Sequence, residues 1–262
     1  SQNCFKLIPS NVDCETTLSE MKSIYICHAN IGEDEGTKDL KSTKVALAKG
    51  DRENISPIER VSINMLWAIN HLEEINQGAD MGLLDVEECI QDTHTKLMAK
   101  ILRRKNVGVF STEMRIAEYK GEIHEYPRFY SELEAYNETL RIVDLYNHTL
   151  NYIKECRMES FEAVSLYFRC AAWILYNFVA IHPFTDGNGR MCRLLASHCL
   201  YLVCPFPCPI YNIHAPSTRK DYLEAVIGAQ KSNGKELGPL VALLVECCWS
   251  SYQYFFDSIK IQ

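Results

Sequence analysis

Residues 181–193 read IHPFTDGNGRMCR and lie between two predicted helices. The apolar residues before this turn predict a central buried helix over 160–181, and the spacing after it predicts an amphipathic helix over 189–203. Gly187 and Gly189 allow backbone conformations closed to other residues, so successive N–H groups can converge on an anion. The N-terminus of the second helix adds unpaired N–H groups and the positive end of its dipole. The turn is therefore predicted to bind an anion.

The charged and titratable side chains of this turn extend the prediction. Arg190 and Arg193 are three residues apart, which puts both on one face at the start of the helix. Asp186 supplies an oxygen ligand of the kind that Mg²⁺ prefers beside phosphate. His182 stands just before the turn and can act as a base near neutral pH. Together these residues predict a site for a Mg²⁺-bound polyphosphate with a base beside it.

Three other anion or cation motifs do not fit. A calcium loop opening at Asp186 needs Gly at its sixth place and Glu at its twelfth, where this chain has Met191 and Ser197. No G-x-x-x-x-G-K-[ST] sequence occurs, which excludes a P-loop enzyme by motif. The glycine pair also lacks the preceding strand of a dinucleotide-binding site.

Composition narrows the class of protein. Of the 262 residues, 47% are hydrophobic and 23% charged, as in an ordinary globular chain. The formal net charge of −7 argues against a nucleic-acid or anionic-membrane binder. The uncharged stretch 170–185 is too short for a membrane span, and no N-terminal signal pattern is visible. We therefore expect no nucleic-acid partner, no membrane span in this chain, and an intracellular, cytoplasmic location with reduced thiols.

The twelve cysteines are scattered along the chain. Cys204 and Cys208 could form half of a zinc site, but no second matching pair is evident, so packed or exposed thiols are favoured. Cys192 lies beside the predicted anion site at a helix N-terminus, and from that position we expect a reactive thiol.

Helical spacing dominates the chain from residue 56 onward, so we predict an all-α bundle of about eight helices. Ser56-Pro57-Ile58-Glu59 is a capping box with Pro at the first helical position. The exception is 107–127, where two apolar runs interrupted by Lys120-Gly121 predict a β-hairpin. The first 50 residues show the least pattern. The predicted helices cover 56–75, 83–102, 130–152, 160–181, 189–203, 218–230 and 237–261.

The turn resembles the signature of the Fic family, H-P-F-x-[DE]-G-N-G-R-x-x-R, and every fixed position matches. The resemblance extends more loosely from about Pro57 to Leu243. It implies that 61–72 and 84–97 are the family's helices before the hairpin, that 108–127 is its target-binding flap, and that 218–229 closes the nucleotide pocket. It also implies a catalytic domain over 56–262 and, before it, an N-terminal extension over 1–55, a region that can serve regulation in such proteins.

Most Fic proteins transfer AMP from ATP to a hydroxyl of a target protein. The resemblance implies that His182 takes the proton of a Ser, Thr or Tyr hydroxyl, with ATP as co-substrate and Mg²⁺ or Mn²⁺ held by Asp186. Phe184 would be buried to keep the loop in shape. The implied nucleotide-binding residues are Asp186, Gly187, Asn188, Gly189, Arg190, Met191, Cys192, Arg193 and Tyr222. The implied flap residues for target binding are Arg115, Ile116, Ala117 and Glu118.

Other functions stay open at the level of sequence. Enzymatic alternatives are removal of AMP from modified targets and transfer of another nucleotide such as UMP. Removal of AMP would need a carboxylate near Arg193 to orient water. A non-enzymatic alternative is an ATP-binding interaction module, although an intact His182 and Asp186 argue against it. Protein substrates are the expected partners, and a homodimer is allowed.

Many family members carry an inhibitory helix with [ST]-x-x-x-E-[GN], whose Glu pairs with the second Arg of the signature. No strict match exists here, and Gly32 stands where the Glu is expected. Our hypothesis from the sequence is that the inhibitory contact is missing or altered, which would leave Arg193 free for phosphate. Glu33 and Glu35 stay open as substitutes.

Overall fold

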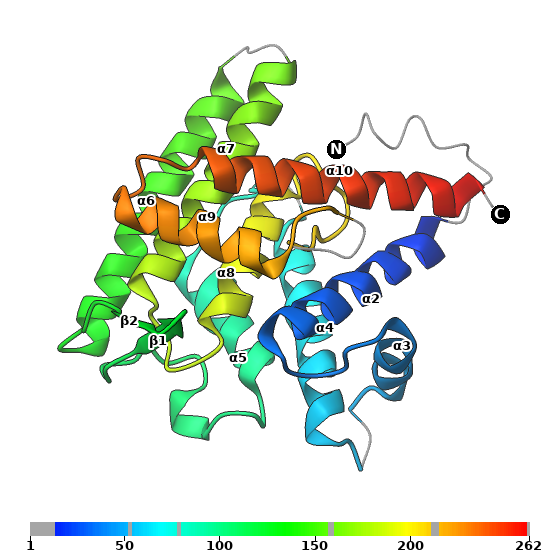
Figure 1. The fold of residues 1–262 in the computed structure, drawn as a ribbon, viewed down its shortest axis with the longest axis horizontal. Helices are drawn as coiled ribbons and strands as arrows, with labels where there is room; N and C mark the ends of the chain where they lie inside the picture. The colour runs from blue at the N-terminus through cyan, green and yellow to red at the C-terminus, as the bar shows by residue number, and fades with distance from the viewer. Residues whose placement is uncertain (1–13, 52–53, 78–79, 157–159, 211–214, 261–262) are drawn as a thin grey trace.

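The computed structural model describes residues 14–51, 54–77, 80–156, 160–210 and 215–260. This part of the chain is an assembly of α-helices with one small antiparallel sheet, so the predicted all-α fold with a β-hairpin is confirmed (Figure 1). The helices are α2 (Cys14–Glu33), α3 (Leu40–Lys49), α4 (Pro57–Ile75), α5 (Thr93–Met98), α6 (Glu132–Glu155), α7 (Ser160–Ile181), α8 (Asn188–Leu200), α9 (Arg219–Lys231) and α10 (Gly238–Lys260). The strands are β1 (Ile116–Tyr119) and β2 (Glu122–Glu125).

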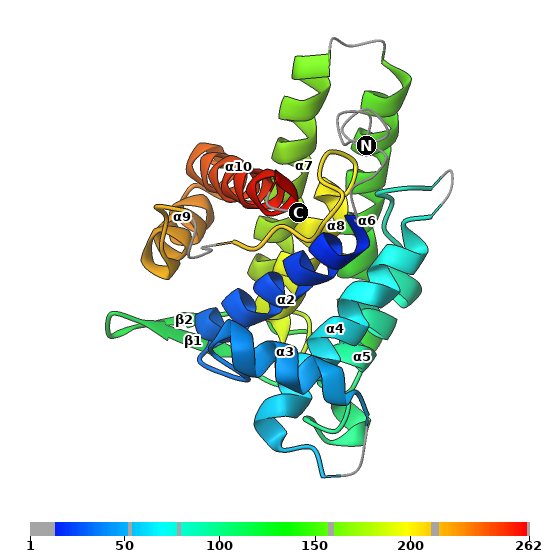
Figure 2. The same cartoon turned by 90° about the vertical axis from the view of Figure 1, so that its right-hand side faces the viewer.

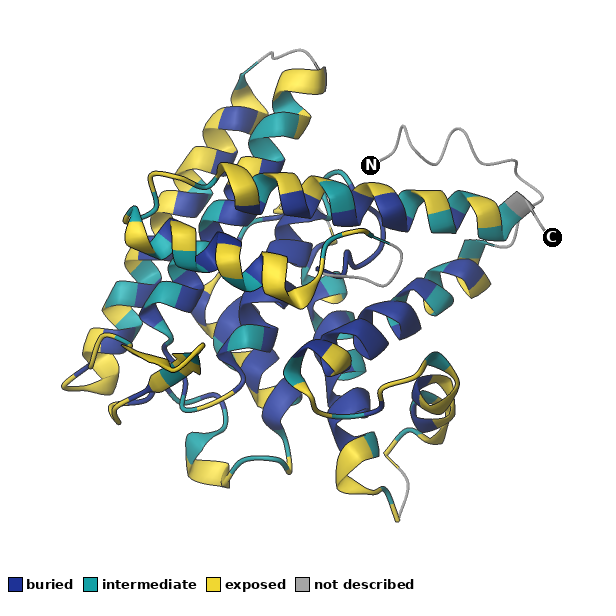
Figure 3. Ribbon diagram, in the orientation of Figure 1, coloured by how far each residue is buried: buried dark blue, intermediate teal, exposed yellow. Residues whose placement is uncertain are grey.

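Helix α7 is the centre of the core. It packs against α6, α8, α9 and α10, and Figures 1 and 2 both show α6 and α7 side by side. Residues 161–181 are long and apolar enough to cross a membrane, but half of that window is buried inside the fold. Dark blue runs through the middle of α7 and all along α8 in Figure 3. The motif between these two helices is therefore anchored at both ends in the core.

The predicted capping box is present at the start of α4. The Ser56 hydroxyl accepts a hydrogen bond from the Glu59 N–H, and the Glu59 carboxylate accepts one from the Ser56 N–H. Thr218 and Asp221 form the same reciprocal pair at the start of α9. Both boxes satisfy N–H groups that a helix start leaves unpaired.

The stretch 83–102, predicted as one helix, is built differently. A π-helical segment, Val86–Asp92, precedes the short α5, and the chain leaves the helix at Ala99. Cys89, Ile90 and Leu97 are buried. The wider π turn changes the register, so that His94 is also buried and faces the motif loop.

The hairpin is shorter than predicted. Strands β1 and β2 pair in register from Ile116–Glu125 to Tyr119–Glu122, and the turn is at Lys120-Gly121 as expected. Both turn residues have positive φ (54° and 79°), which is typical of a tight type I′ hairpin. Residues 107–115 form no strand, but the Ser111 N–H donates to the Pro183 carbonyl and ties this segment to the motif.

The weakly patterned N-terminal region proves well folded from residue 14. Met21, Ile24, Tyr25 and Ile26 of α2 are buried, because α3, α4 and α10 cover the helix on several sides. Burial on several sides leaves no simple polar face, which explains why the sequence showed little periodicity. Residues 1–13 lie outside the described part of the chain. The boundary at residue 55 stays a prediction, although α2 packs directly on α8.

Candidate active site

The motif loop has a fixed shape. The Asn188 side chain accepts from the Phe184 N–H (2.9 Å) and donates to the Phe184 carbonyl (2.7 Å), which closes the loop on itself. Gly187 has φ +80°, and a Cβ there would lie 2.9 Å from the Met98 sulfur, so glycine is required. The Phe184 ring is fully buried, as predicted, and stacks on His94 with ring centroids 3.7 Å apart.

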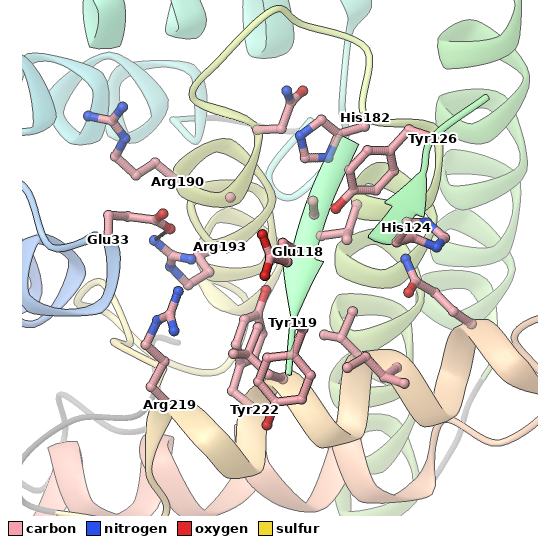
Figure 4. Close-up of a pocket in the computed structure, with 18 of the residues that line it drawn as sticks. Glu33, Glu118, Tyr119, His124, Tyr126, His182, Arg190, Arg193, Arg219 and Tyr222 are labelled. Atoms are coloured by element: carbon pink, nitrogen blue, oxygen red, sulfur yellow. Dashed lines mark hydrogen bonds and ion pairs between the residues drawn. The ribbon is translucent and has the colours of Figure 1, made fainter. Parts of the chain in front are cut away.

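A cavity of about 620 Å³ opens above this loop (Figure 4). Its walls are the motif, the hairpin, the inner face of α9 and the end of α2. Its size is that of an ordinary small-molecule site. The structure brings most of the predicted site residues together in its lining: His182, Asp186, Gly187, Asn188, Gly189, Arg190, Arg193, Tyr222, Ala117 and Glu118.

Four predicted site residues do not line the cavity. Met191 and Cys192 point into the core and are fully buried. Burial raises the pKa of the Cys192 thiol to about 11, so the expectation of a reactive thiol is wrong. The Ile116 side chain is exposed on the hairpin. Arg115 is buried and donates to three backbone carbonyls, those of Ser111, Glu113 and Pro127, so it fixes the base of the hairpin.

Arg193 is not free. Its Nη2 lies 2.5 Å from Oε1 of Glu33, the last residue of α2, and its side chain is only 4% exposed. The expectation that Arg193 is free for phosphate is therefore wrong: the contact is altered rather than missing, and Glu33, one of the two substitutes left open, supplies the carboxylate. Although burial acts to raise the pKa of Glu33, pairing with Arg193 holds it below the usual value.

The Glu33 carboxylate occupies the anion position itself. A Cβ on Gly189 would lie 2.7 Å from Glu33 Oε1, so the carboxylate sits directly over the start of α8. The Arg219 Nε donates to the Gly32 carbonyl (2.6 Å) and holds the end of α2 from the side of α9. Figure 4 shows Glu33 flanked by these arginines. The end of α2 thus carries a carboxylate in the place predicted for phosphate.

Arg190 keeps unused binding capacity. Its Nη1 is 3.1 Å from Glu35 Oε2, within ion-pair distance, yet it makes no hydrogen bond of normal geometry to any residue that the structure describes. The Arg190 side chain is 3% exposed, whereas that of Glu35 is 45% exposed. A buried cationic N–H at a cavity wall with a poorly aligned partner is suited to an incoming anion.

His182 stands at the end of α7 with φ +47°, a conformation uncommon outside glycine. Burial lowers the pKa of its imidazole to about 4, with Arg115 and His124 adding to the effect and Asp186 opposing it. The ring is therefore neutral at pH 7 and able to accept a proton. The Tyr126 ring lies flat against it, with centroids 3.7 Å apart.

Asp186 is the candidate metal ligand. Its side chain is exposed into the cavity, and Oδ1 accepts a hydrogen bond from the Gly187 N–H (2.6 Å). Within the described residues, no group of three or more His, Cys, Asp or Glu side chains could hold a metal alone. Cys204 and Cys208, weighed as half a zinc site, are both buried.

Sequence reasoning missed residues that come from outside the motif. His94 is fully buried and joins two loops: its Nε2 contacts the Asp186 carbonyl (3.0 Å), and its Nδ1 accepts from the Gly108 N–H (2.9 Å). Tyr126 and Arg219 were not singled out either. A titratable residue in an otherwise apolar helical face could have marked His94, but nothing local marks Tyr126.

Comparisons with known proteins agree with this geometry. Residues 84–200 match the model of the Fic/DOC family. A Fido domain-containing protein from Dictyostelium discoideum is 33% identical over 94 residues, which are 35% of this chain. That match spans 62% of the Dictyostelium protein, less than two thirds of its length.

Solved structures share the fold at low sequence identity. Fic-1 from C. elegans superposes with a TM-score of 0.70 at 20% identity, covering 97% of this chain and 68% of the other. A Fic domain-containing signaling protein from Bacteroides thetaiotaomicron gives a TM-score of 0.68 at 20% identity, covering 94% and 91%.

Proposed function

This chain belongs to the Fic/DOC family, and we propose that it is a protein adenylyltransferase, which transfers AMP from ATP to a Ser, Thr or Tyr hydroxyl of a target protein. The observation that carries the proposal is one cavity that joins a neutral His182 to the N-terminus of α8 and its two arginines. A base and a polyphosphate site in the same cavity are what this reaction needs.

The phosphates of ATP would bind at the start of α8. The backbone of Gly187 and Gly189 supplies N–H groups there, and Arg190 and Arg193 supply buried positive charge. The poorly aligned Nη1 of Arg190 favours this assignment, because a phosphate oxygen would complete its hydrogen bonding. The apolar side chains of Val226 and Ile227 on α9 line the same cavity and offer a surface for the adenine ring of ATP.

The residues present fit a divalent cation shared between protein and substrate. Mg²⁺ is commonly held by one or two carboxylates together with substrate phosphates, and Asp186 is a single carboxylate exposed to the cavity. Mg²⁺ or Mn²⁺ bound there would neutralise charge on the phosphates. Asp186 itself is oriented by the Gly187 N–H.

The chemical step joins the target hydroxyl to the α-phosphorus of ATP. His182 accepts the proton of the target hydroxyl, and the oxygen attacks the α-phosphorus of ATP. A new P–O bond to the target forms as the bond between the α-phosphorus and its bridging oxygen breaks, and pyrophosphate leaves. Removing the base should cost about 10²- to 10⁴-fold in rate.

The hairpin would align the target. β1 pairs only with β2 among the described strands, so its other edge is open to an added strand. Ala117 and Glu118 on β1 line the cavity beside His182. A target segment that extends the sheet along β1 would present its hydroxyl to the base.

One observation favours a second candidate, the hydrolytic removal of AMP from modified proteins. That reaction needs a carboxylate to orient water near the phosphates, and Glu33 lies beside Arg193. Water would then attack the phosphorus, the bond to the target oxygen would break, and AMP would leave.

The test is incubation of the full chain with α-³²P-ATP and Mg²⁺ in a cell lysate, beside His182→Ala and Glu33→Ala. Label on protein that disappears with His182→Ala supports AMP transfer. Loss of label from a pre-modified target, dependent on Glu33, supports removal of AMP. Binding of ATP by calorimetry with neither activity would refute both and leave an ATP-binding module or another nucleotide such as UMP.

A further inference from the structure

Tyr126, the residue after β2, covers one face of His182. The two rings are nearly parallel, with planes 14° apart and centroids 3.7 Å apart. The rings of Tyr126 and His124 are nearly perpendicular, with centroids 4.8 Å apart, and both residues line the cavity (Figure 4). This contact joins the hairpin to the candidate base across 56 residues of sequence, which separate positions 126 and 182.

The imidazole of His182 has few other restraints. Its Nδ1 is buried and makes no hydrogen bond of normal geometry within the described residues, although the Val179 carbonyl is near enough to affect its pKa. A catalytic histidine is usually oriented by a hydrogen bond on the nitrogen that does not react. The backbone of His182 is in addition at φ +47°, a conformation that must be held by its surroundings.

Tyr126 is itself held at the base of the hairpin. Its N–H donates to the Arg115 carbonyl (3.0 Å), and the Arg115 guanidinium donates to the carbonyl of Pro127. The ring position therefore follows the position of β1, which carries Ala117 and Glu118 at the cavity wall.

We propose that Tyr126 is the positioning residue for His182: its ring holds the imidazole in the orientation that meets the target hydroxyl. The proposal rests on the proposed function of His182 as the base. Because the hairpin carries Tyr126, a target that binds β1 would also steady the base. Flat contact of an aromatic face also stabilises the positively charged imidazole formed when the proton is taken up.

The experiment compares Tyr126→Leu, which removes the flat ring, with Tyr126→Phe, which keeps it. Tyr130→Leu is the matched control, because Tyr130 lies four residues further along and is 85% exposed. Label transfer from α-³²P-ATP is measured in the parent chain and in the Glu33→Ala background. Misplacement of a catalytic group by about 1 Å costs on the order of 10²-fold, so we expect Tyr126→Leu to lower kcat by about 10- to 100-fold.

The KM for ATP should stay within about twofold, since no phosphate contact is removed, and Tyr126→Phe should retain activity within about threefold of the parent. Retention of kcat by Tyr126→Leu, or an equal loss in Tyr126→Phe, would overturn the proposal. Should Tyr126→Leu not fold, judged by thermal denaturation, Tyr126→Met takes its place.

A second measurement does not depend on activity. Proton NMR of the His182 ring should show an upfield ring-current shift in the parent and in Tyr126→Phe, which Tyr126→Leu abolishes. The same histidine shifts in all three proteins would overturn the proposal even if the enzyme is active. An upfield shift without any label transfer in the parent would instead refute the proposed function while supporting the ring contact.

Discussion

Removal of the Glu33 carboxylate should increase the rate of the proposed AMP transfer. Glu33 Oε1 and Arg193 Nη2 are 2.5 Å apart, and the arginine side chain is 4% exposed against 28% for the glutamate. A hydrogen bond between charged groups contributes about 1.5–3 kcal/mol, and a phosphate that takes over Arg193 must first break it. At about 1.4 kcal/mol per factor of ten, Glu33→Ala should raise the labelling rate at sub-saturating ATP by roughly 10- to 100-fold.

The assay is the initial rate of α-³²P-ATP incorporation as a function of ATP concentration. Glu35→Gln is the matched control, since its carboxylate contacts Arg190 from a side chain that is 45% exposed. Because Arg190 Nη1 makes no hydrogen bond of normal geometry with this half-exposed carboxylate, the control should change the rate by less than about threefold. A Glu33→Ala rate within twofold of the parent, or an equal gain in Glu35→Gln, would refute the reasoning.

Thermal denaturation gives an independent reading of the same contact. Without ATP, Glu33→Ala should melt below the parent, because the buried Arg193 loses the carboxylate with which it forms an ion pair. Saturating ATP with Mg²⁺ should restore more of the melting temperature in the variant than in the parent, because the ligand binds only the folded state and meets no competing carboxylate.

Three further predictions concern the surroundings of the motif. The pKa of Glu33 is lowered in the folded state, so the stabilising effect of its carboxylate is present above the unfolded pKa and is lost as pH falls through the folded pKa. The difference in Tm between the parent and Glu33→Gln should therefore shrink on acidification below the usual glutamate pKa. A difference that stays constant would contradict this. His94→Phe keeps the stack on Phe184 but leaves the Gly108 N–H and the Asp186 carbonyl unpaired, so the free energy of unfolding measured in urea should fall by about 2–5 kcal/mol. A fall of less than about 1 kcal/mol would be inconsistent with both hydrogen bonds. Cys192, fully buried with a pKa of about 11, should not react with iodoacetamide at pH 8 in the native protein, and mass spectrometry of the labelled peptides would detect any reaction.

The motif could be predicted because its chemistry is local. His182, Asp186 and the two arginines are encoded within twelve residues, and a helical spacing of three suffices to put Arg190 and Arg193 on one face. The predicted capping box at Ser56 held for the same reason, since its two partners are three residues apart. Contacts of this kind depend on backbone geometry that neighbouring residues fix.

Contacts made over long sequence separations could not be predicted in the same way. The position of the carboxylate on Arg193 depends on where α2 ends, and the chain leaves the helix after Glu33, with Asp34 at φ +59°. A spacing carried over from the family put the carboxylate one residue earlier, at Gly32. The stack of Tyr126 on His182 depends likewise on how the hairpin packs against the end of α7, which no local pattern encodes.

The position of Glu33 links two processes in the proposed function: release of its carboxylate from Arg193 and binding of ATP at the same arginine. The carboxylate lies over Gly189 at the start of α8, where the helix dipole and the N–H groups attract any anion. Under the proposed function, the phosphates of ATP and the Glu33 carboxylate therefore compete for Arg193 rather than acting at separate sites. Displacement of Glu33 also frees the end of α2, which Arg219 otherwise holds through the Gly32 carbonyl. A ligand that draws α2 away from α8 should accordingly raise the affinity for ATP. ATP should in turn weaken the contact of α2 with α8 by the same factor, because coupling of two binding equilibria is reciprocal.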